Sequence, residues 1–434
     1  MADPSRNSPE PLTVEASPPG LEGWRRTFTA LRNPNYRFFY IGQGLSLIGT
    51  WARSSALFWL AFAWTGSEFM TGMVAFTNSL PTLLFSILAG SMADRRSKLG
   101  IFRATSWFSL LSSTAMAAFI FSGNHHTALL LVFGLLWGTA TAFEMPSRQS
   151  LIVDLVGRRD LSNAIALNSA MVNLSRVVGP ALGGWLIAAF GPAWCFVLDA
   201  LSFVAVLVGI RHIQLPPSTA PPGEGGALDH MGEAYAFVRR SPDLARTLGM
   251  LLVMSLGGWS YQSQLSPFVS KTLHMGAYGY GCMLAFAALG ACLAALGVAY
   301  LNERLTTQAP AYAGVVVFSI SIILCGFQTE PVAAAFFLFC SGFGLILFFS
   351  TSNTYLQSHV PDALRGRIMG LWALVFGGGM PIGALWMGIM AGKFGSARTL
   401  QMGGLFCLVA GSAVYFACSR KQVPVEPAPP ESIP

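Results

Sequence analysis

The sequence predicts an all-α integral membrane protein built from two six-helix bundles, and three observations support this fold class. Hydrophobic residues make up 53% of the 434 residues and charged residues 10%. An ordinary soluble domain is about 25% charged. The apolar residues gather in long segments, each near the roughly 20 residues that a helix needs to cross a bilayer. The segments lack the alternation of membrane strands, so helices are predicted.

Twelve such segments follow one another along the chain. Their approximate spans are 36–64, 69–91, 99–122, 127–149, 163–190, 192–210, 247–270, 276–301, 308–328, 331–357, 366–392 and 397–418. Glycine and proline occur inside several spans, which is compatible with membrane helices because neighbouring helices satisfy the freed backbone groups.

Polar and proline-rich stretches divide the chain into five regions. The expected regions are a disordered cytoplasmic tail at 1–23, a six-helix bundle at 24–210, a cytoplasmic linker at 211–246, a second six-helix bundle at 247–420 and a second disordered tail at 421–434. Apolar residues within the linker, from Leu228 to Val238, follow helical spacing. An amphipathic helix lying flat on the membrane surface is therefore expected there.

The basic residues predict the orientation. With both termini inside, most of the 26 basic residues fall in cytoplasmic tails, loops or helix ends, as the positive-inside rule requires. These loops also account for the net charge of +7. No basic stripe interleaved with exposed aromatics is present, so no nucleic-acid partner is expected. The predicted location is the inner (plasma) membrane, with the lipid bilayer around a multi-pass chain whose termini are both cytoplasmic.

The two halves of the chain carry an internal repeat. Pro180, Trp185 and Gly191 return with the same spacing as Pro381, Trp386 and Gly392. This repetition agrees with the count of six segments before and six after the linker. It predicts two bundles related by a pseudo-two-fold axis along the membrane normal.

Several motifs lie within or at the ends of the apolar segments. They are GSMADRRSK at 90–98, AFEMPSRQS at 142–150, NAIALNS at 163–169, GPALGG at 179–184, NYRFF at 35–39 and PDALRGR at 361–367. Together they resemble the major facilitator superfamily over about residues 33–420. The resemblance is to one branch, the bacterial twelve-helix exporters of the transmembrane secretion effector type, which includes siderophore and macrolide exporters.

The resemblance implies a secondary active transporter that works by alternating access. It implies export of a small organic compound, drug-like or siderophore-like as in the enterobactin exporters, with protons as the counter-substrate. A monomer without cofactor is expected. Two other transport modes, uptake and uncoupled movement, are alternatives. A non-transporting membrane protein, such as a sensor or a membrane-embedded enzyme, is a further alternative.

A conformational switch is implied at the ends of helices two and eleven. It comprises Gly90, Asp94, Arg95, Lys98, Gly366 and Arg367. Gly90 would let the two helices approach closely, and Asp94 would accept hydrogen bonds at the positive N-terminal end of helix eleven. Arg95 and Lys98 would pair with acids such as Asp154 or Asp160. The alternative is a positive loop that only fixes the topology.

A second motif, in helix five, resembles the one associated with exporters. Its residues are Gly179, Pro180, Gly183 and Gly184, and helix eight offers the equally small residues Gly290, Ala291, Ala294 and Gly297. Small residues permit close helix contact. A seam between helices five and eight that seals the outer side is therefore expected, with simple close packing as the alternative.

Charged side chains inside the predicted spans are functional candidates by default, because an unpaired charge in a bilayer is costly. The candidates for proton or charge coupling are Arg53, Glu144, Arg148, Arg176 and Asp199. Asp199 is expected to pair with Arg53 or Arg176, and a purely structural ion pair is the alternative. Glu144, with Arg148 four residues later, is the first candidate for proton coupling.

Polar and aromatic residues could line an amphipathic substrate cavity. The candidates are Gln43, Ser46, Trp137, Trp259, Tyr261, Gln262, Asn353, Tyr355 and Gln357. Each could instead be a packing residue. The seven cysteines and the histidines lack metal-ligand spacing, so no metal is expected. No nucleophile–base pair stands out, so an enzyme is not expected.

Overall fold

The computed structural model describes residues 29–213, 227–301 and 307–419, and a few side chains inside these ranges, those of Asp94 and Arg95 among them, are not described. Both predicted tails, 1–23 and 421–434, lie outside the described residues. The described chain forms helices and contains no strand.

The first half contains six membrane-length helices. Its elements are α1 (Pro34–Thr65), α2 (Glu68–Arg95), α3 (Lys98–Phe121), α4 (Thr127–Phe190) and α5 (Ala193–Arg211). The long α4 is two helices in one, because Gly157 interrupts it with φ 67° and ψ −178°. Glycine adopts this backbone conformation without the penalty of a side chain. The break separates the two segments that the sequence predicts at 127–149 and 163–190.

The second half begins with α6 (Ala227–Arg240) in the linker. The membrane helices that follow are α7 (Pro242–Val253) with α8 (Leu265–Lys271), α9 (Ala277–Leu301), α10 (Ala309–Cys325), α11 (Pro331–His359), α12 (Asp362–Phe394) and α13 (Ser396–Ser419). A π-helical turn, η2 (Met254–Trp259), and a 3-10 turn, η3 (Ser260–Gln264), join α7 to α8. These four elements form a single interrupted helix at the predicted span 247–270.

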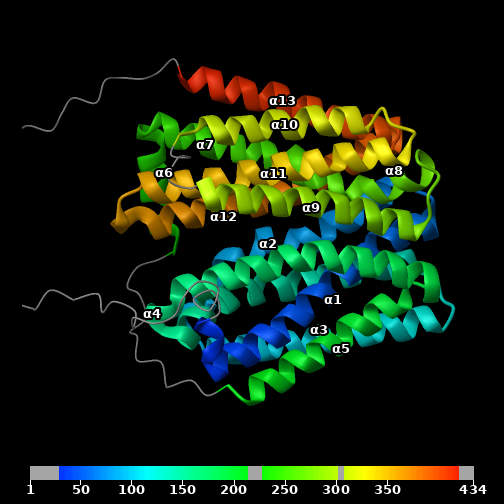
Figure 1. The fold of residues 1–434 in the computed structure, drawn as a ribbon, viewed down its shortest axis with the longest axis horizontal. Helices are drawn as coiled ribbons and strands as arrows, with labels where there is room; N and C mark the ends of the chain where they lie inside the picture. Colours follow the sequence, from blue (N-terminus) through cyan, green and yellow to red (C-terminus); the bar gives the residue numbers. More distant parts are fainter. Residues whose placement is uncertain (1–28, 214–226, 302–306, 420–434) are drawn as a thin grey trace, which may run out of the picture.

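The helices stand side by side in two layers, α1–α5 in one and α7–α13 in the other, with α6 at one end (Figure 1). We call this end the linker end, and the opposite end, where α1 turns into α2, the distal end. Seven helices in the described ranges are long and apolar enough to cross a membrane, and α10 is a shorter apolar helix. The all-α membrane fold predicted from the sequence is confirmed.

The NYRFF motif at 35–39, with Asn33 and Pro34 before it, has a structural role at the start of α1. The Asn33 side chain caps α1 by accepting a hydrogen bond from the Asn35 amide at 2.9 Å, and Pro34 occupies the first turn. The Asn33 amide group also donates to the Leu155 carbonyl at 2.7 Å. The Tyr36 hydroxyl donates to the carbonyl of α4 residue 164 at 2.9 Å. The start of α1 is therefore bound to the middle of α4 at the linker end.

The two halves touch closely at the distal end. A Cβ atom added at Gly72 of α2 would lie 2.4 Å from the Gly388 Cα of α12. One added at Gly184 of α4 would lie 2.7 Å from the Gly281 Cα of α9. Only glycine fits at such distances, so both pairs bring the backbones of opposite halves into contact.

Contact between α2 and α12 is lost towards the linker end. A Cβ atom at Gly377 would still lie 3.4 Å from the Thr82 side chain. At Gly366, Gly370 and Gly90 an added Cβ would meet no atom within 4 Å. The two helices therefore diverge from their middle towards the end at which α6 lies.

Candidate functional site

Two adjoining cavities lie between the halves, and we call them together the central cavity. The larger has a volume of about 230 Å³ and is lined from one half by Trp51, Ser54 and Asn78. From the other half it is lined by Trp259 and Gln262, which also line the smaller cavity of about 50 Å³. Residues of both halves thus face one polar and aromatic space inside the bundle.

The interrupted helix positions the wall contributed by the second half. A Cβ at Gly383 of α12 would collide with the Ser260 hydroxyl, so α12 must approach closely here. The Trp386 indole donates to the Leu256 carbonyl at 3.3 Å, and the Ser255 hydroxyl donates to a carbonyl of α12. These bonds satisfy backbone groups near the irregular turns, as interrupted membrane helices require. The turns lie at the level where Trp259 and Gln262 reach the cavity.

Arg176 on α4 faces the smaller cavity. Its guanidinium carbon lies 5.6 Å from the Trp51 ring centroid and 5.3 Å from that of Trp259. The sequence offers Arg176 as one of two partners for Asp199, and the structure assigns that carboxylate to Arg53. Arg176 instead stands between two tryptophans that come from opposite halves.

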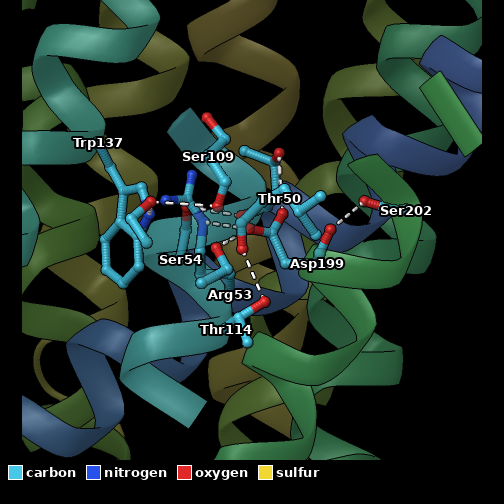
Figure 2. A network of polar contacts seen from close by, with 11 residues as sticks. Thr50, Arg53, Ser54, Ser109, Thr114, Trp137, Asp199 and Ser202 are labelled. Atoms are coloured by element: carbon cyan, nitrogen blue, oxygen red, sulfur yellow. Dashed lines mark hydrogen bonds and ion pairs between the residues drawn. The ribbon is translucent and has the colours of Figure 1, made fainter. Parts of the chain in front are cut away.

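A buried ion pair joins α1 to α5 within the first half. Arg53 Nε lies 3.1 Å from Asp199 Oδ2, and the aspartate is fully buried. The Ser113 hydroxyl donates to Asp199 Oδ2 at 2.6 Å, and the Thr50 hydroxyl donates to Oδ1 at 3.2 Å. Figure 2 shows Arg53 and Asp199 pointing toward each other. The pairing of Asp199 with Arg53 confirms one of the two predicted partners.

Arg53 also stacks on Trp137. Its guanidinium carbon lies 4.2 Å from the centroid of the indole, and the Trp137 Nε1 donates to the Ser112 hydroxyl at 2.9 Å. The Trp137 ring also stacks on Phe196. Trp137 is absent from the lining of both parts of the central cavity, so its predicted place in the cavity wall is wrong. It supports the ion pair from inside the first half.

Glu144 and Arg148 form a second charge pair of the first half, within α4. Glu144 Oε1 lies 3.5 Å from Arg148 NH1. Gln43 hydrogen-bonds to the Glu144 carboxylate, which also interacts electrostatically with Arg53 and Asp199. Gln43 is thus a neighbour of the charges and does not line the central cavity. We call the four charged residues Arg53, Glu144, Arg148 and Asp199 the charge cluster.

The remaining residues predicted to line the substrate cavity lie at different depths along their helices. Trp259, Tyr261 and Gln262 line the central cavity, whereas the buried Ser46 is not part of its wall.

The three candidates on α11 lie near its linker end and are absent from the lining of the central cavity. The Gln357 amide donates to the Asn353 side chain, and Tyr355 stacks on His359 at 4.1 Å. They do not join Trp259 in one cavity wall as predicted, because they lie beyond Phe349, the α11 residue that packs on Trp259.

The switch residues are partly described. Lys98 Nζ lies 2.8 Å from Asp154 Oδ2, which confirms the predicted pairing with an acid of α4. The side chains of Asp94 and Arg95 lie outside the described residues. The close approach expected at Gly90 is absent, because α2 and α12 diverge there and touch at Gly72 instead. At the start of α12, Gly366 likewise meets nothing within 4 Å, and Arg367 has an interaction partner.

The helix-five motif contacts two helices. Gly179 and Gly183 pack against Trp51 and Ala52 of α1 in their own half. Gly184 and the Pro180 carbonyl reach α9, at Gly281.

The contact of α4 with α9, which is the predicted helix eight, therefore lies nearer the distal end than expected. Gly290 packs on Phe339 of α11, and at Gly297 an added Cβ would meet nothing within 4 Å. The seam expected at these two glycines is absent, because Gly290 faces α11 and Gly297 faces open space.

Several residues of the site are not predicted from the sequence, among them Trp51, Lys271 and Glu68. Trp51 lines both cavities, although an aromatic residue in an apolar span carries no distinguishing pattern. Lys271 and Glu68 form an ion pair of 3.2 Å that joins the halves at the distal end. Both stand at predicted segment ends, where charged residues are ordinary, so only the fold reveals the pair.

Comparison with known proteins identifies the family. The family model described as transmembrane secretion effector, of the major facilitator superfamily, matches residues 25–429. The chain belongs to this family. Its members are transporters rather than enzymes, and this protein is accordingly an integral multi-pass membrane transporter of small molecules.

Three curated relatives of this secretion effector are exporters or transporters. The staphyloferrin A transporter of Staphylococcus aureus is 23% identical over 395 residues, covering 90% of this chain and 98% of the relative. The multidrug efflux pump Tap of Mycolicibacterium fortuitum is 24% identical over 387 residues, covering 86% and 92%. The enterobactin exporter EntS of Citrobacter koseri is 28% identical over 267 residues, covering 59% and 61%.

Solved structures share the fold of this secretion effector. A bacterial homolog of the human lysosomal transporter Spinster, inward-facing and unoccupied, aligns with a TM-score of 0.67 and 16% identity, covering 89% of this chain and 97% of the other. The nucleoside transporter NupG aligns with a TM-score of 0.67 and 12% identity, covering 89% and 99%. At these identities the likeness concerns the fold alone.

Proposed function

We propose that this secretion effector exports a small organic compound, drug-like or siderophore-like, by alternating access coupled to proton antiport. The observation that carries the proposal is the central cavity, walled by Trp51 of one half and Trp259 of the other. When two halves that both line a site rock against each other, the site opens to one side of the membrane and closes to the other. The siderophore and drug exporters among its relatives support the outward direction.

The linker end is proposed to be cytoplasmic. Basic residues concentrate in the loops of this end, which the positive-inside rule assigns to the cytoplasm. Both termini are then cytoplasmic, in the inner membrane of the cell. The halves meet at Gly72 and Gly388 on the opposite side, so the arrangement described here corresponds to an inward-facing state. The Spinster homolog of similar fold is also inward-facing.

The switch acts, in this proposal, when the linker end closes. Asp94 would then accept hydrogen bonds from the start of α12 near Gly366 and Arg367, where the helix dipole is positive. Arg95 and Lys98 flank this contact, and Lys98 is already held by Asp154. Gly90 and Gly366 have no atom in the way of closure.

The charge cluster is proposed to couple transport to protons. Two acids and two bases stand together inside the first half, and their charges balance. Asp199 has three polar partners from two helices, α1 and α3, which suits a fixed charge. Glu144 has the longer 3.5 Å contact to Arg148. Glu144 is therefore the acid proposed to take up and release the proton, in a transporter that works as a monomer.

A substrate screen in cells tests the export proposal. Cells expressing the wild type and cells expressing an Asp94→Asn variant at equal level are loaded with fluorescent dyes, antibiotics and siderophores. Wild-type cells should retain less of at least one compound than variant cells. Equal retention of every compound would contradict export, and higher retention in wild-type cells would point to uptake.

A further inference from the structure

Arg176 is the only charged residue that lines the central cavity within the described part of the chain. The remaining lining is aromatic, aliphatic or neutral polar, with Ser54, Asn78 and Gln262 among the polar groups. A ligand in this cavity would therefore meet one positive charge and no negative one among the described residues. That asymmetry bears directly on the charge of the ligand.

No carboxylate neutralises Arg176 within the described ranges. Other arginines of the bundle lie next to an acid, as Arg53 does with Asp199 and Arg148 with Glu144. Arg176 has no such pair, and its buried Nε lacks a hydrogen-bond partner in the described part of the protein. An arginine inside a bilayer ordinarily finds a partner, since its desolvation is costly. The site thus lacks the anion that would complete it.

The tryptophans hold the guanidinium without occupying its hydrogen-bonding groups. Trp51 and Trp259 lie within 5.6 Å and 5.3 Å of the Arg176 carbon, which is cation–π range. Ring faces stabilise the cation, whereas the N–H groups of a guanidinium lie in its own plane. The two terminal nitrogens of the guanidinium can therefore donate to two oxygens of a carboxylate or a similar oxyanion.

We infer that Arg176 is the binding residue for an anionic group on the transported compound, next to a planar or aromatic portion that packs on Trp51 and Trp259. The inference rests on the proposed export function and narrows its substrate class. Cationic compounds are disfavoured, because the same guanidinium repels them in a site where solvent screening is weak. The two tryptophans belong to opposite halves, so the anion would bind at the contact between them.

Three probes with one ring system test the inference. Naphthoate, naphthamide and naphthylmethylammonium carry a negative, a neutral and a positive substituent on the same aromatic frame. Their binding to the full-length protein in lipid nanodiscs is measured by calorimetry. The wild type should bind naphthoate about tenfold or more tightly than naphthamide, as a charge-assisted bidentate contact implies. Naphthylmethylammonium should bind weakest.

Two variants test whether Arg176 causes the preference for the anionic probe. Arg176→Gln should bind naphthoate and naphthamide equally, whereas Arg176→Lys should retain part of the preference for the anion. The matched control is Arg103→Gln, which removes an exposed arginine of α3 outside the cavity and should leave the preference unchanged. Thermal unfolding of each variant reports whether it is folded.

The inference is overturned if wild-type protein binds naphthoate no better than naphthamide, or binds none of the probes up to millimolar concentration. It is also overturned if folded Arg176→Gln keeps the full preference. If Arg176→Gln does not fold, the order of the three probe affinities in the wild type and in Arg176→Lys tests the inference instead. Binding is read without transport, so a protein that prefers the anion and exports nothing would contradict only the export proposal.

Discussion

Gly72 of α2 and Gly388 of α12 bring the two halves of the bundle into backbone contact at the distal end. A Cβ at Gly72 would lie 2.4 Å from the Gly388 Cα, well inside van der Waals distance. Towards the other end the same helices separate, and Gly90 meets no neighbour within 4 Å. This gradient along one helix pair defines which side of the central cavity is closed.

Replacing Gly72 by leucine should force the distal end open, because the added side chain has no space beside α12. Spin labels are attached at Asn124 and Glu330 in a background without native cysteines. The expected result is a longer distance between the two labels, measured by double electron–electron resonance. Gly276→Leu is the matched control, since a Cβ there meets nothing within 4 Å. An unchanged distance in Gly72→Leu would show that the contact does not hold the halves together.

The ion pair between Glu68 and Lys271 should act as a weak distal latch. Lys271 is half-exposed, with 50% of its side chain accessible, and exposed ion pairs contribute about 0.2–1 kcal/mol. Glu68→Gln and Lys271→Gln should each shift the label distances modestly toward the open form. The double variant should add nothing further, and the charge-reversed pair Glu68→Lys with Lys271→Glu should restore the original distribution. Additive effects would argue against the latch.

Asp199→Asn should destabilise the first half, because Arg53 would remain buried without its counter-charge. Breaking one partner of a buried ion pair typically costs about 3–5 kcal/mol. The measurement is thermal unfolding in detergent, with Asp154→Asn as the control for a surface ion pair. A loss of stability no larger than that of the control would mean that the buried pair is not structural.

Glu144→Gln should uncouple transport from protons while leaving exchange of substrate intact. The variant retains the shape of the side chain and removes its proton-binding carboxylate. Substrate-driven counterflow in proteoliposomes should persist, and accumulation driven by a pH gradient should be lost. Full gradient-driven accumulation in Glu144→Gln would exclude Glu144 as the coupling acid.

The sequence predicts the helices well because each one must span a bilayer, and length and polarity suffice to locate it. The break at Gly157 and the irregular turns before Leu265 fall within or beside predicted segments without changing the count. The partner of Asp199 was narrowed to two arginines, because a buried carboxylate requires a cation at similar depth. Depth along a helix is readable from residue numbers.

The direction in which a side chain points is harder to read. Trp137 was expected in the cavity and lies in the core of the first half against Phe196. Asn353 lies on α11 near the linker end, apart from the cavity. In a helix without a strongly polar face, polar residues do not reveal which neighbour they meet.

The contact expected at Gly90 failed for another reason. In the proposed alternating-access cycle this contact forms only when the linker end is closed, and one sequence encodes both states.

The central claim is that this chain moves a compound outward in exchange for protons. Inverted membrane vesicles containing the wild type, made acidic inside, test it with the compound identified by the cellular screen. The account predicts accumulation inside the vesicles that stops when an ionophore collapses the pH gradient. Accumulation that is unaffected by the gradient, or that is equal in vesicles without the protein, would contradict it.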